Sequence, residues 1–128
     1  MSRTTSRGFT IIELLVVLFV IAVLAAIAVP RLQQQKNKGI QATMVSDLSL
    51  LAKMQEGYYY TTGAYTTSLV ALNLELSPGN SVVINEATTS GWSATMDHVP
   101  SIGRTCYIFY GNATPPGSAT TEGVPSCS

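Results

Sequence analysis

The sequence predicts an α+β fold, in which one long N-terminal helix packs on a small antiparallel β-sheet of three to four strands. Three features of the sequence lead to this prediction. An uninterrupted apolar run extends from Phe9 to Val29, and an amphipathic pattern with helical spacing follows it. Three strand-like runs separated by turn residues come later, and a helix followed by short strands is the order typical of α+β proteins.

The composition describes a small protein with an apolar appendage. The 128 residues suffice for one domain, and only 11% of them are charged, against about 25% in an average protein. The formal net charge is zero, so the composition gives no indication of a nucleic-acid-binding function. We therefore predict no sequence-specific binding of nucleic acid.

The sequence lacks the patterns of catalytic and cofactor-binding sites. Its single histidine, His98, follows Asp97, and such a pair is more often a surface pair than a metal site. Neither a glycine-rich phosphate loop nor a zinc-binding spacing is present. We therefore expect no enzyme, no metal site and no cofactor.

The apolar run of residues 9–29 has the length of a membrane-spanning helix. Its 21 residues make a helix of about 31 Å at ~1.5 Å per residue, which matches a hydrocarbon core of about 30 Å. The run is apolar on all sides, and lipid forces a spanning segment to satisfy its own backbone groups. A membrane helix is therefore predicted.

One acidic residue, Glu13, interrupts this run. A charge inside a membrane helix costs on the order of 3 kcal/mol on insertion scales, and such a group normally faces a partner. The nearest available positive charge would be a free α-amine, if the chain were cut between Gly8 and Phe9. That amine would lie about one turn from Glu13 on its own helix, and it could come closer on an axially staggered neighbouring copy.

Three interpretations of the N-terminus compete. A cleavable signal peptide fits the basic leader and the small residues at 26–28, but Glu13 interrupts its apolar core and Pro30 would directly follow the first mature residue. An uncleaved membrane anchor leaves Glu13 without a partner. Cleavage on the cytoplasmic side after Gly8, with the helix retained, supplies that partner.

The stretch from Gly8 to Val17, GFTIIELLVV, resembles the class III signal of type IV pilins and pseudopilins. In that family a short basic leader ends in glycine, a membrane-embedded prepilin peptidase cuts after it, and the new first residue is N-methylated. A glutamate at the fifth mature position is required for efficient filament assembly. The one small departure from the pattern is Ile11, where leucine is commoner.

The resemblance implies roles for three residues and a set of partners. Residues 1–8 would be a cleaved leader ending in Gly8, Phe9 would become the N-methylated N-terminus, and Glu13 would be the assembly acid. The implied partners are further copies of the chain in a helical filament, a prepilin peptidase and N-methyltransferase, a pilus assembly ATPase with its inner-membrane platform, minor pilins, and the membrane before assembly.

The resemblance also implies an orientation, with the leader in the cytoplasm and the C-terminal part outside. The charge rule for membrane helices does not decide it, because cations flank the apolar run on both sides. Arg3 and Arg7 precede the run, whereas Arg31, Lys36 and Lys38 follow it.

A polar and then amphipathic segment follows the apolar run. Residues 9–30 are predicted to form the transmembrane and filament-core helix, and residues 31–58 its amphipathic continuation within an extracytoplasmic head, residues 31–128. Pro30 and Gly39 are the predicted sites of a break or bend. In pili of the family the region around the matching proline loses helicity on assembly, and the resemblance implies a similar change. The apolar positions of the continuation are Ile40, Met44, Val45, Leu48, Leu51 and Ala52.

The rest of the head is predicted to contain a connecting loop and a sheet. The loop, residues 59–80, begins with tyrosines whose rings are expected to cover the sheet edge with their hydroxyls outward; an aromatic contact path between subunits is the alternative. The antiparallel sheet occupies residues 81–111, with strands at 81–86, 91–98 and 105–110. In the second strand Trp92, Ala94 and Met96 are expected to face the helix, whereas Ser93, Thr95 and Asp97 are expected to face water.

Two cysteines, Cys106 and Cys127, lie near the C-terminus. An even count in a chain with an export-like N-terminus favours a disulfide over two buried free thiols. Such a bond would fix the C-terminal loop, residues 106–127, to the third strand. The resemblance implies that this is the exposed disulfide-bounded loop of type IV pilins, which the large calcium-binding pseudopilins usually lack.

The function implied by the resemblance is structural. We expect a type IV pilin, in particular the major subunit of a bacterial pilus or fimbrium that serves adhesion, twitching motility or DNA uptake. The precursor would wait in the inner membrane and the mature chain would be found in the extracellular pilus. The alternatives are a pseudopilin of a type II secretion or competence system and a soluble secreted binding module released after Ala28.

Overall fold

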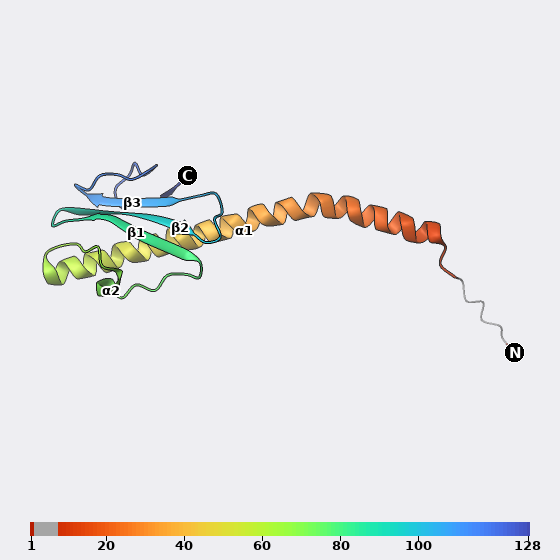
Figure 1. The fold of residues 1–128 in the computed structure, drawn as a ribbon, viewed down its shortest axis with the longest axis horizontal. Coiled ribbons are helices and arrows are strands. Elements are labelled where there is room, and N and C mark those ends of the chain that lie inside the picture. Colours follow the sequence, from red (N-terminus) through yellow and green to blue (C-terminus); the bar gives the residue numbers. More distant parts are fainter. Residues whose placement is uncertain (2–7) are drawn as a thin grey trace. The chain divides into compact units, whose positions relative to one another are not determined.

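The structure, a computed structural model, describes residue 1 and residues 8–128. This part of the chain forms one long helix, one short helix and four strands. Figure 1 shows their arrangement along the chain. Their bounds are Ile11–Thr62 for α1, Leu69–Leu72 for α2, Asn80–Ala87 for β1, Gly91–His98 for β2, Cys106–Gly111 for β3 and Ser126–Cys127 for β4. The chain forms two compact units, Met1–Lys36 and Asn37–Ser128. The predicted α+β fold is confirmed.

The helix α1 has no interruption, which corrects the predicted helix break. Pro30 and Gly39 both lie inside the helix, so neither breaks it in the single subunit. Pro30 has no N–H to donate to the preceding turn, but the hydrogen bonds of the turns on either side keep the chain helical. The loss of helicity around Pro30 on assembly stays a prediction.

The C-terminal end of α1 lies beyond the predicted Tyr58. The hydroxyls of Thr61 and Thr62 donate to the carbonyl of Tyr58 at 2.9 and 2.8 Å. A carbonyl near the helix end is thereby hydrogen-bonded. Gly63 follows with a φ of 76°, and its N–H donates to the carbonyl of Tyr59 at 2.7 Å. Since glycine with positive φ is the usual residue after a helix end, the chain turns back at this point.

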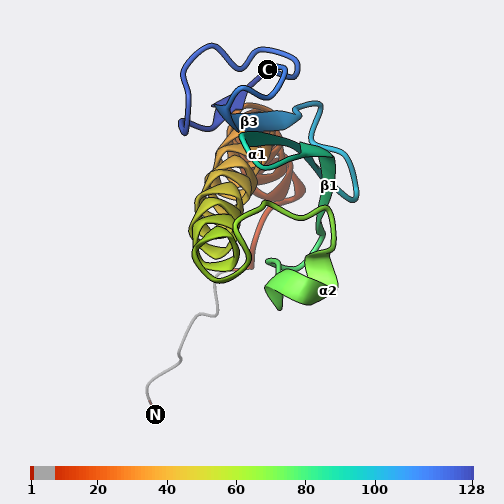
Figure 2. The same ribbon diagram turned by 90° about the vertical axis from the view of Figure 1, so that its left-hand side faces the viewer.

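In the second unit, α1 packs on one face of the sheet (Figure 2). Met44, Leu48 and Leu51 are fully buried, as their helical spacing predicts. The buried apolar side chains of the sheet are Val82, Ile84, Trp92, Ala94, Met96, Cys106 and Ile108. Full burial of a side chain of the size of leucine stabilises the fold by about 1.5–3 kcal/mol. The contact between α1 and the sheet therefore forms the hydrophobic core that stabilises the unit.

The sheet has the strand order β1-β2-β3-β4, and all neighbouring strands are antiparallel. The register of β1 shifts between Ile84 and Glu86, which marks a bulge. One prediction for β2 is wrong: Ser93 is buried, with 1% of its surface exposed, instead of facing water. Ser93 lies opposite Glu86 and Phe109 on the sheet face that does not contact α1, so that face is also covered.

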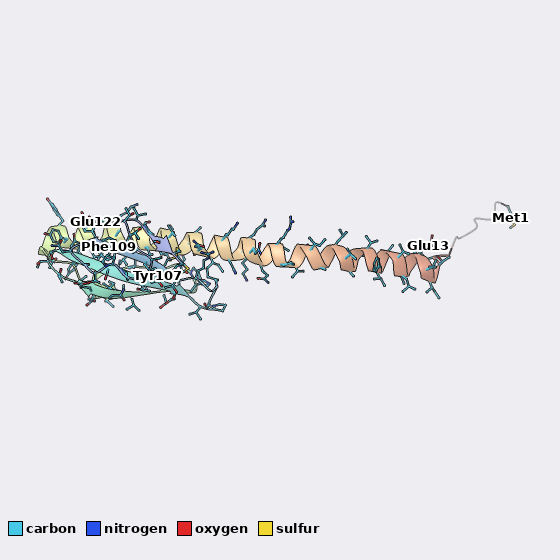
Figure 3. All side chains as sticks on the ribbon, turned by 90° about the horizontal axis from the view of Figure 1, so that it is seen from above. Met1, Glu13, Tyr107, Phe109 and Glu122 are labelled. Carbon is cyan, nitrogen blue, oxygen red and sulfur yellow. A yellow bond between two sulfur atoms is a disulfide. The ribbon has the colours of Figure 1, made fainter. Side chains whose placement is uncertain are left out.

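The C-terminal tail covers this outer face. Figure 1 shows the tail on the side of β3 opposite α1, and Figure 3 shows Tyr107, Phe109 and Glu122 in this region. The N–H of Gly123 donates to the carbonyl of Phe109 at 2.8 Å, and the carboxylate of Glu122 accepts from the N–H of Gly111 at 2.8 Å. A side chain on Gly117 would collide with the ring of Tyr107. The tail thus lies directly against β3.

A disulfide closes the tail. Cys106 and Cys127 are bonded to each other, so the predicted disulfide is confirmed and the alternative of two free thiols is wrong. The two residues of β4 pair with the start of β3: Cys127 lies opposite Cys106, and Ser126 lies opposite Tyr107. The sheet ladder and the covalent bond therefore hold the same two points together.

A buried carboxylate fixes the turn before β1 to α1. Asp47 is only 6% exposed, although it lies on the helix among apolar residues. Its oxygens accept from the N–H and hydroxyl of Ser77 at 2.8 and 3.0 Å and from the side-chain amide of Asn80 at 2.6 Å. The other end of that amide, Oδ1 of Asn80, lies 2.7 Å from Nδ1 of His98. Because a buried carboxylate without partners would be strongly unfavourable, these contacts determine where the turn lies.

The disulfide gives a first testable prediction. In a fragment of residues 37–128, Cys106→Ser is expected to lower the free energy of unfolding by roughly 3 kcal/mol in the chain-entropy model. The variant should therefore unfold at a lower denaturant concentration than the unsubstituted fragment. Denaturation followed by Trp92 fluorescence measures this. Dithiothreitol should weaken the unsubstituted fragment and leave the variant unchanged. Equal midpoints for the two oxidised proteins would contradict the prediction.

Candidate functional site

The first half of α1 is an apolar surface that the chain itself does not cover. The large apolar side chains from Ile11 to Val29 are between 46% and 80% exposed. The most apolar stretch has a mean hydropathy of 3.1, and none of it is buried. Within the described residues α1 is the one helix that is long and apolar enough to cross a membrane. The surface has the chemistry to be covered by lipid or by other apolar helices.

Glu13 lies in the first turn of α1, as Figure 3 shows, and it forms a reciprocal cap with Thr10. One carboxylate oxygen, Oε2, accepts from the N–H and the hydroxyl of Thr10 at 3.0 and 2.9 Å. The hydroxyl oxygen of Thr10 in turn accepts from the N–H of Glu13 at 3.2 Å. This arrangement is a capping box, which satisfies N–H groups that have no partner at a helix start.

The capping box changes the interpretation of Glu13. Glu13 has a partner even on an uncleaved chain, because Thr10 supplies two hydrogen bonds. The pattern Thr-x-x-Glu before an apolar run is the sequence signal that identifies such a box. Hydrogen bonds from neutral groups do not neutralise the carboxylate, so its charge still requires a cation in an apolar environment.

Phe9 and Glu13 share one face of the helix start. Together with Ile12, Val16 and Val17 they line a shallow surface groove of about 360 Å³. Phe9 is 81% exposed. Gly8 is also exposed, with open space around it. The structure thus places the expected junction and the expected assembly acid within about one turn of each other. Residues 2–7 of the expected leader, with Arg3 and Arg7, lie outside the described residues.

The tyrosines of the second unit form an aromatic cluster that differs from the expected one. The ring of Tyr65 stacks on that of Tyr59 at 4.7 Å and meets the edge of Tyr110 at 6.2 Å. Tyr65 is buried, and its hydroxyl donates to Oε1 of Glu56 at 3.1 Å instead of pointing outward. Tyr60, by contrast, is 91% exposed and covers nothing. The cluster therefore connects Tyr59 of α1 and Tyr110 of β3 through Tyr65 of the connecting loop.

Burial raises the pKa of Tyr65 well above the ordinary tyrosine value, and the hydrogen bond to Glu56 adds to the effect. Desolvation disfavours the phenolate, and the negative charge of the neighbouring carboxylate disfavours it further. Because its pKa is raised, Tyr65 stays neutral to a higher pH than an ordinary tyrosine side chain.

The comparisons with known proteins point to one family. Residues 3–29 match the family model described as the prokaryotic N-terminal methylation motif. The type IV wide pilus major component PilA4 of Thermus thermophilus is 35% identical over 78 residues, which cover 59% of this chain and 60% of that protein. The fimbrial protein EcpC of Eikenella corrodens is 32% identical over 99 residues, 71% of this chain and 62% of that protein.

A second kind of relative comes from secretion systems. The type II secretion system core protein G of Klebsiella michiganensis is 34% identical over 68 residues, 53% of this chain and 48% of that protein. The chain belongs to the type IV pilin and pseudopilin family. The matched regions span about half to three fifths of these relatives. The names are those of pilus, fimbrial and secretion-system components.

The capping box of this pilin-family chain can be tested directly. Thr10→Val keeps the shape of the side chain and removes its hydroxyl, so the N–H of Glu13 loses its acceptor. Hydrogen exchange of the Glu13 amide in detergent micelles should become faster by up to about tenfold, since loss of an N-cap costs roughly 1 kcal/mol. Thr10→Ser is the matched control and should exchange like the unsubstituted chain. Unchanged exchange in the valine variant would show that no such box forms.

The environment of Tyr65 gives a prediction for pH. A group whose pKa is raised on folding stabilises the folded state below its unfolded value, about 10 for tyrosine, and this contribution is lost as the pH rises further. The free energy of unfolding of the 37–128 fragment should therefore fall above about pH 10. Tyr65→Phe should fall less steeply, whereas Tyr60→Phe, at an exposed site, should follow the unsubstituted fragment. Identical slopes for both variants would contradict the assignment.

Proposed function

We propose that the chain is the major subunit of a type IV pilus, which polymerises through the first half of α1 into an extracellular filament. The observation that carries the proposal is the uncovered apolar length of that helix, from Ile11 to Val29. A single subunit does not cover this surface. A membrane covers it in the precursor, and the helices of other copies cover it in a filament core.

The proposed maturation begins at the junction between Gly8 and Phe9. A prepilin peptidase removes residues 1–8, and the new amine of Phe9 is N-methylated. Cleavage is proposed at this bond because both residues are exposed and the motif matches the family model. An assembly ATPase with its inner-membrane platform then moves the mature chain from the membrane into the filament, where it joins further copies and minor pilins.

In the proposed filament the amine of Phe9 pairs with Glu13 of a neighbouring copy. Oε2 of Glu13 already accepts two hydrogen bonds from Thr10, which leaves the other oxygen to face the amine. An unpaired charge in an apolar core costs several kcal/mol, and a wrong axial register leaves two of them unpaired. Glu13 thereby selects the register of neighbouring subunits.

The proposed domain layout follows from this arrangement. Residues 9–30 form the membrane and filament-core helix, and residues 31–128 form the extracytoplasmic head. The disulfide between Cys106 and Cys127 keeps the C-terminal loop of the head in place on the pilus surface. The precursor is located in the inner membrane, and the mature chain is part of the extracellular pilus.

A second candidate is a pseudopilin of a type II secretion system. It is supported by the similarity to core protein G, which includes a relative from Escherichia coli at 39% identity over 70 residues. The disulfide-bounded tail supports the pilin instead. Surface filaments sheared from cells at native expression decide between the two: a pilin gives filaments that contain this chain, whereas a pseudopilin gives none and its deletion blocks secretion of an exoprotein. If the mass of the mature chain showed that it begins at Val29, both candidates would be refuted.

The role of Glu13 is tested with two variants. Glu13→Ala removes both the charge and the cap, whereas Glu13→Gln can still accept from Thr10 but carries no charge. If the ion pair selects the register, both variants should leave the subunit in the membrane and reduce sheared filaments at least tenfold by immunoblot. Normal filament yield with Glu13→Gln would show that the charge has no role in assembly.

A further inference from the structure

Two exposed cations of the first unit follow the apolar surface, and a third, Lys38, lies at the start of the second unit. Arg31 and Lys36 lie on α1 in the first unit, and both side chains are exposed. The sequence contains no carboxylate between Glu13 and Asp47, so no acidic residue of that segment is available to balance them. On the proposed function they stand on the non-cytoplasmic side of the membrane, where the charge rule disfavours them. A negatively charged group on that side would therefore stabilise them.

Their axial positions fall at the level of lipid headgroups. With ~1.5 Å of rise per residue, the Cα atoms of Arg31 and Lys36 lie about 3 and 10 Å beyond Val29. Each headgroup layer is about 5–8 Å thick around a hydrocarbon core of ~30 Å. Side chains on a helix lean toward its N-terminus, which here is the membrane end. The long side chains of both residues thus extend back to the phosphates.

Arg31 and Lys36 would contact two separate lipid molecules. They are five positions apart, which corresponds to about 140° around the helix axis, so they form a collar instead of one cluster. The planar guanidinium of Arg31 matches a phosphate with two parallel N–H donors, and the ammonium of Lys36 acts as a point charge. Exposed Leu32 lies beside Arg31 and keeps the boundary of the collar apolar.

We propose that Arg31 and Lys36 form a basic collar that binds the phosphates of anionic phospholipids in the non-cytoplasmic leaflet. The inference rests on the proposed function, because that function sets the helix across the membrane. An anionic lipid such as phosphatidylglycerol carries a net negative charge, whereas the choline group of phosphatidylcholine cancels that of its phosphate. The collar therefore distinguishes the two lipids and retains the precursor until the assembly machinery extracts it.

The experiment measures lipid preference on the full-length chain without any assembly machinery. The chain is reconstituted in phosphatidylcholine vesicles with spin-labelled phosphatidylglycerol or spin-labelled phosphatidylcholine. Electron paramagnetic resonance gives the fraction of each probe held at the protein surface. We expect a preference for phosphatidylglycerol that falls by up to about fivefold for each cation removed in Arg31→Gln and Lys36→Gln. Raising the salt from 0.1 to 1 M should weaken it.

The control variants separate the collar from general charge and from folding. Lys53→Gln removes an exposed cation of the second unit and should keep the full preference. Arg31→Lys retains the charge and should keep most of it. Circular dichroism in the same vesicles verifies that each variant is helical. Arg3, Arg7 and Lys38 remain in every variant, so some preference can persist. A double variant, Arg31→Gln with Lys36→Gln, whose preference equals that of the unsubstituted chain would overturn the proposal, as would an unsubstituted chain without any preference.

The outcome is independent of the test for filaments. If the preference in vesicles depends on Arg31 and Lys36 but cells make no filaments of this chain, the collar stands and the pilus is refuted. Filaments from a chain that shows no such preference would do the reverse.

Discussion

Water cannot remain the environment of the first half of α1, and this constraint governs the rest of the molecule. Fourteen large apolar side chains between Ile11 and Val29 are exposed. Full burial of such a side chain contributes ~1.5–3 kcal/mol, and because these are about half exposed, covering them is worth on the order of 10–25 kcal/mol. That is at least as large as the ~5–15 kcal/mol by which a whole domain is usually stable. On the proposed function, the helix exchanges one apolar cover for another, because the helices of other copies replace the lipid when it leaves the membrane.

Polar groups divide the same helix into segments with different surroundings. The start of α1 satisfies its own backbone donors through Thr10 and Glu13, so the chain can present a carboxylate to a partner without unravelling its first turn. In the second unit, Asp47 serves an internal purpose, because its oxygens are occupied by the turn at Ser77 and Asn80. Two acids on one helix thus have different roles, and their partners determine which.

Local periodicity predicted the parts of the fold that depend on neighbouring residues in the sequence. The stripe of Met44, Leu48 and Leu51 and the span of β2 are examples. The failures arise from contacts between distant segments. Ser93 is buried because a tail far along the sequence covers its face of the sheet, and Asp47 is buried because Ser77, thirty residues on, supplies donors. The capping box was readable as Thr-x-x-Glu, but the charge of Glu13 alone suggested a missing partner.

The short strand β4 and the bulge in β1 limit the ways in which this chain can associate. An open sheet edge is a template for strand addition, and uncontrolled addition leads to cross-β aggregates. β4 occupies the edge of β3 at Cys106 and Tyr107, and the covalent bond prevents it from peeling away. The bulge between Ile84 and Glu86 disturbs the regular ladder at the opposite edge. Both features disfavour strand addition at the sheet edges, which in the proposed filament leaves α1 as the surface through which subunits associate.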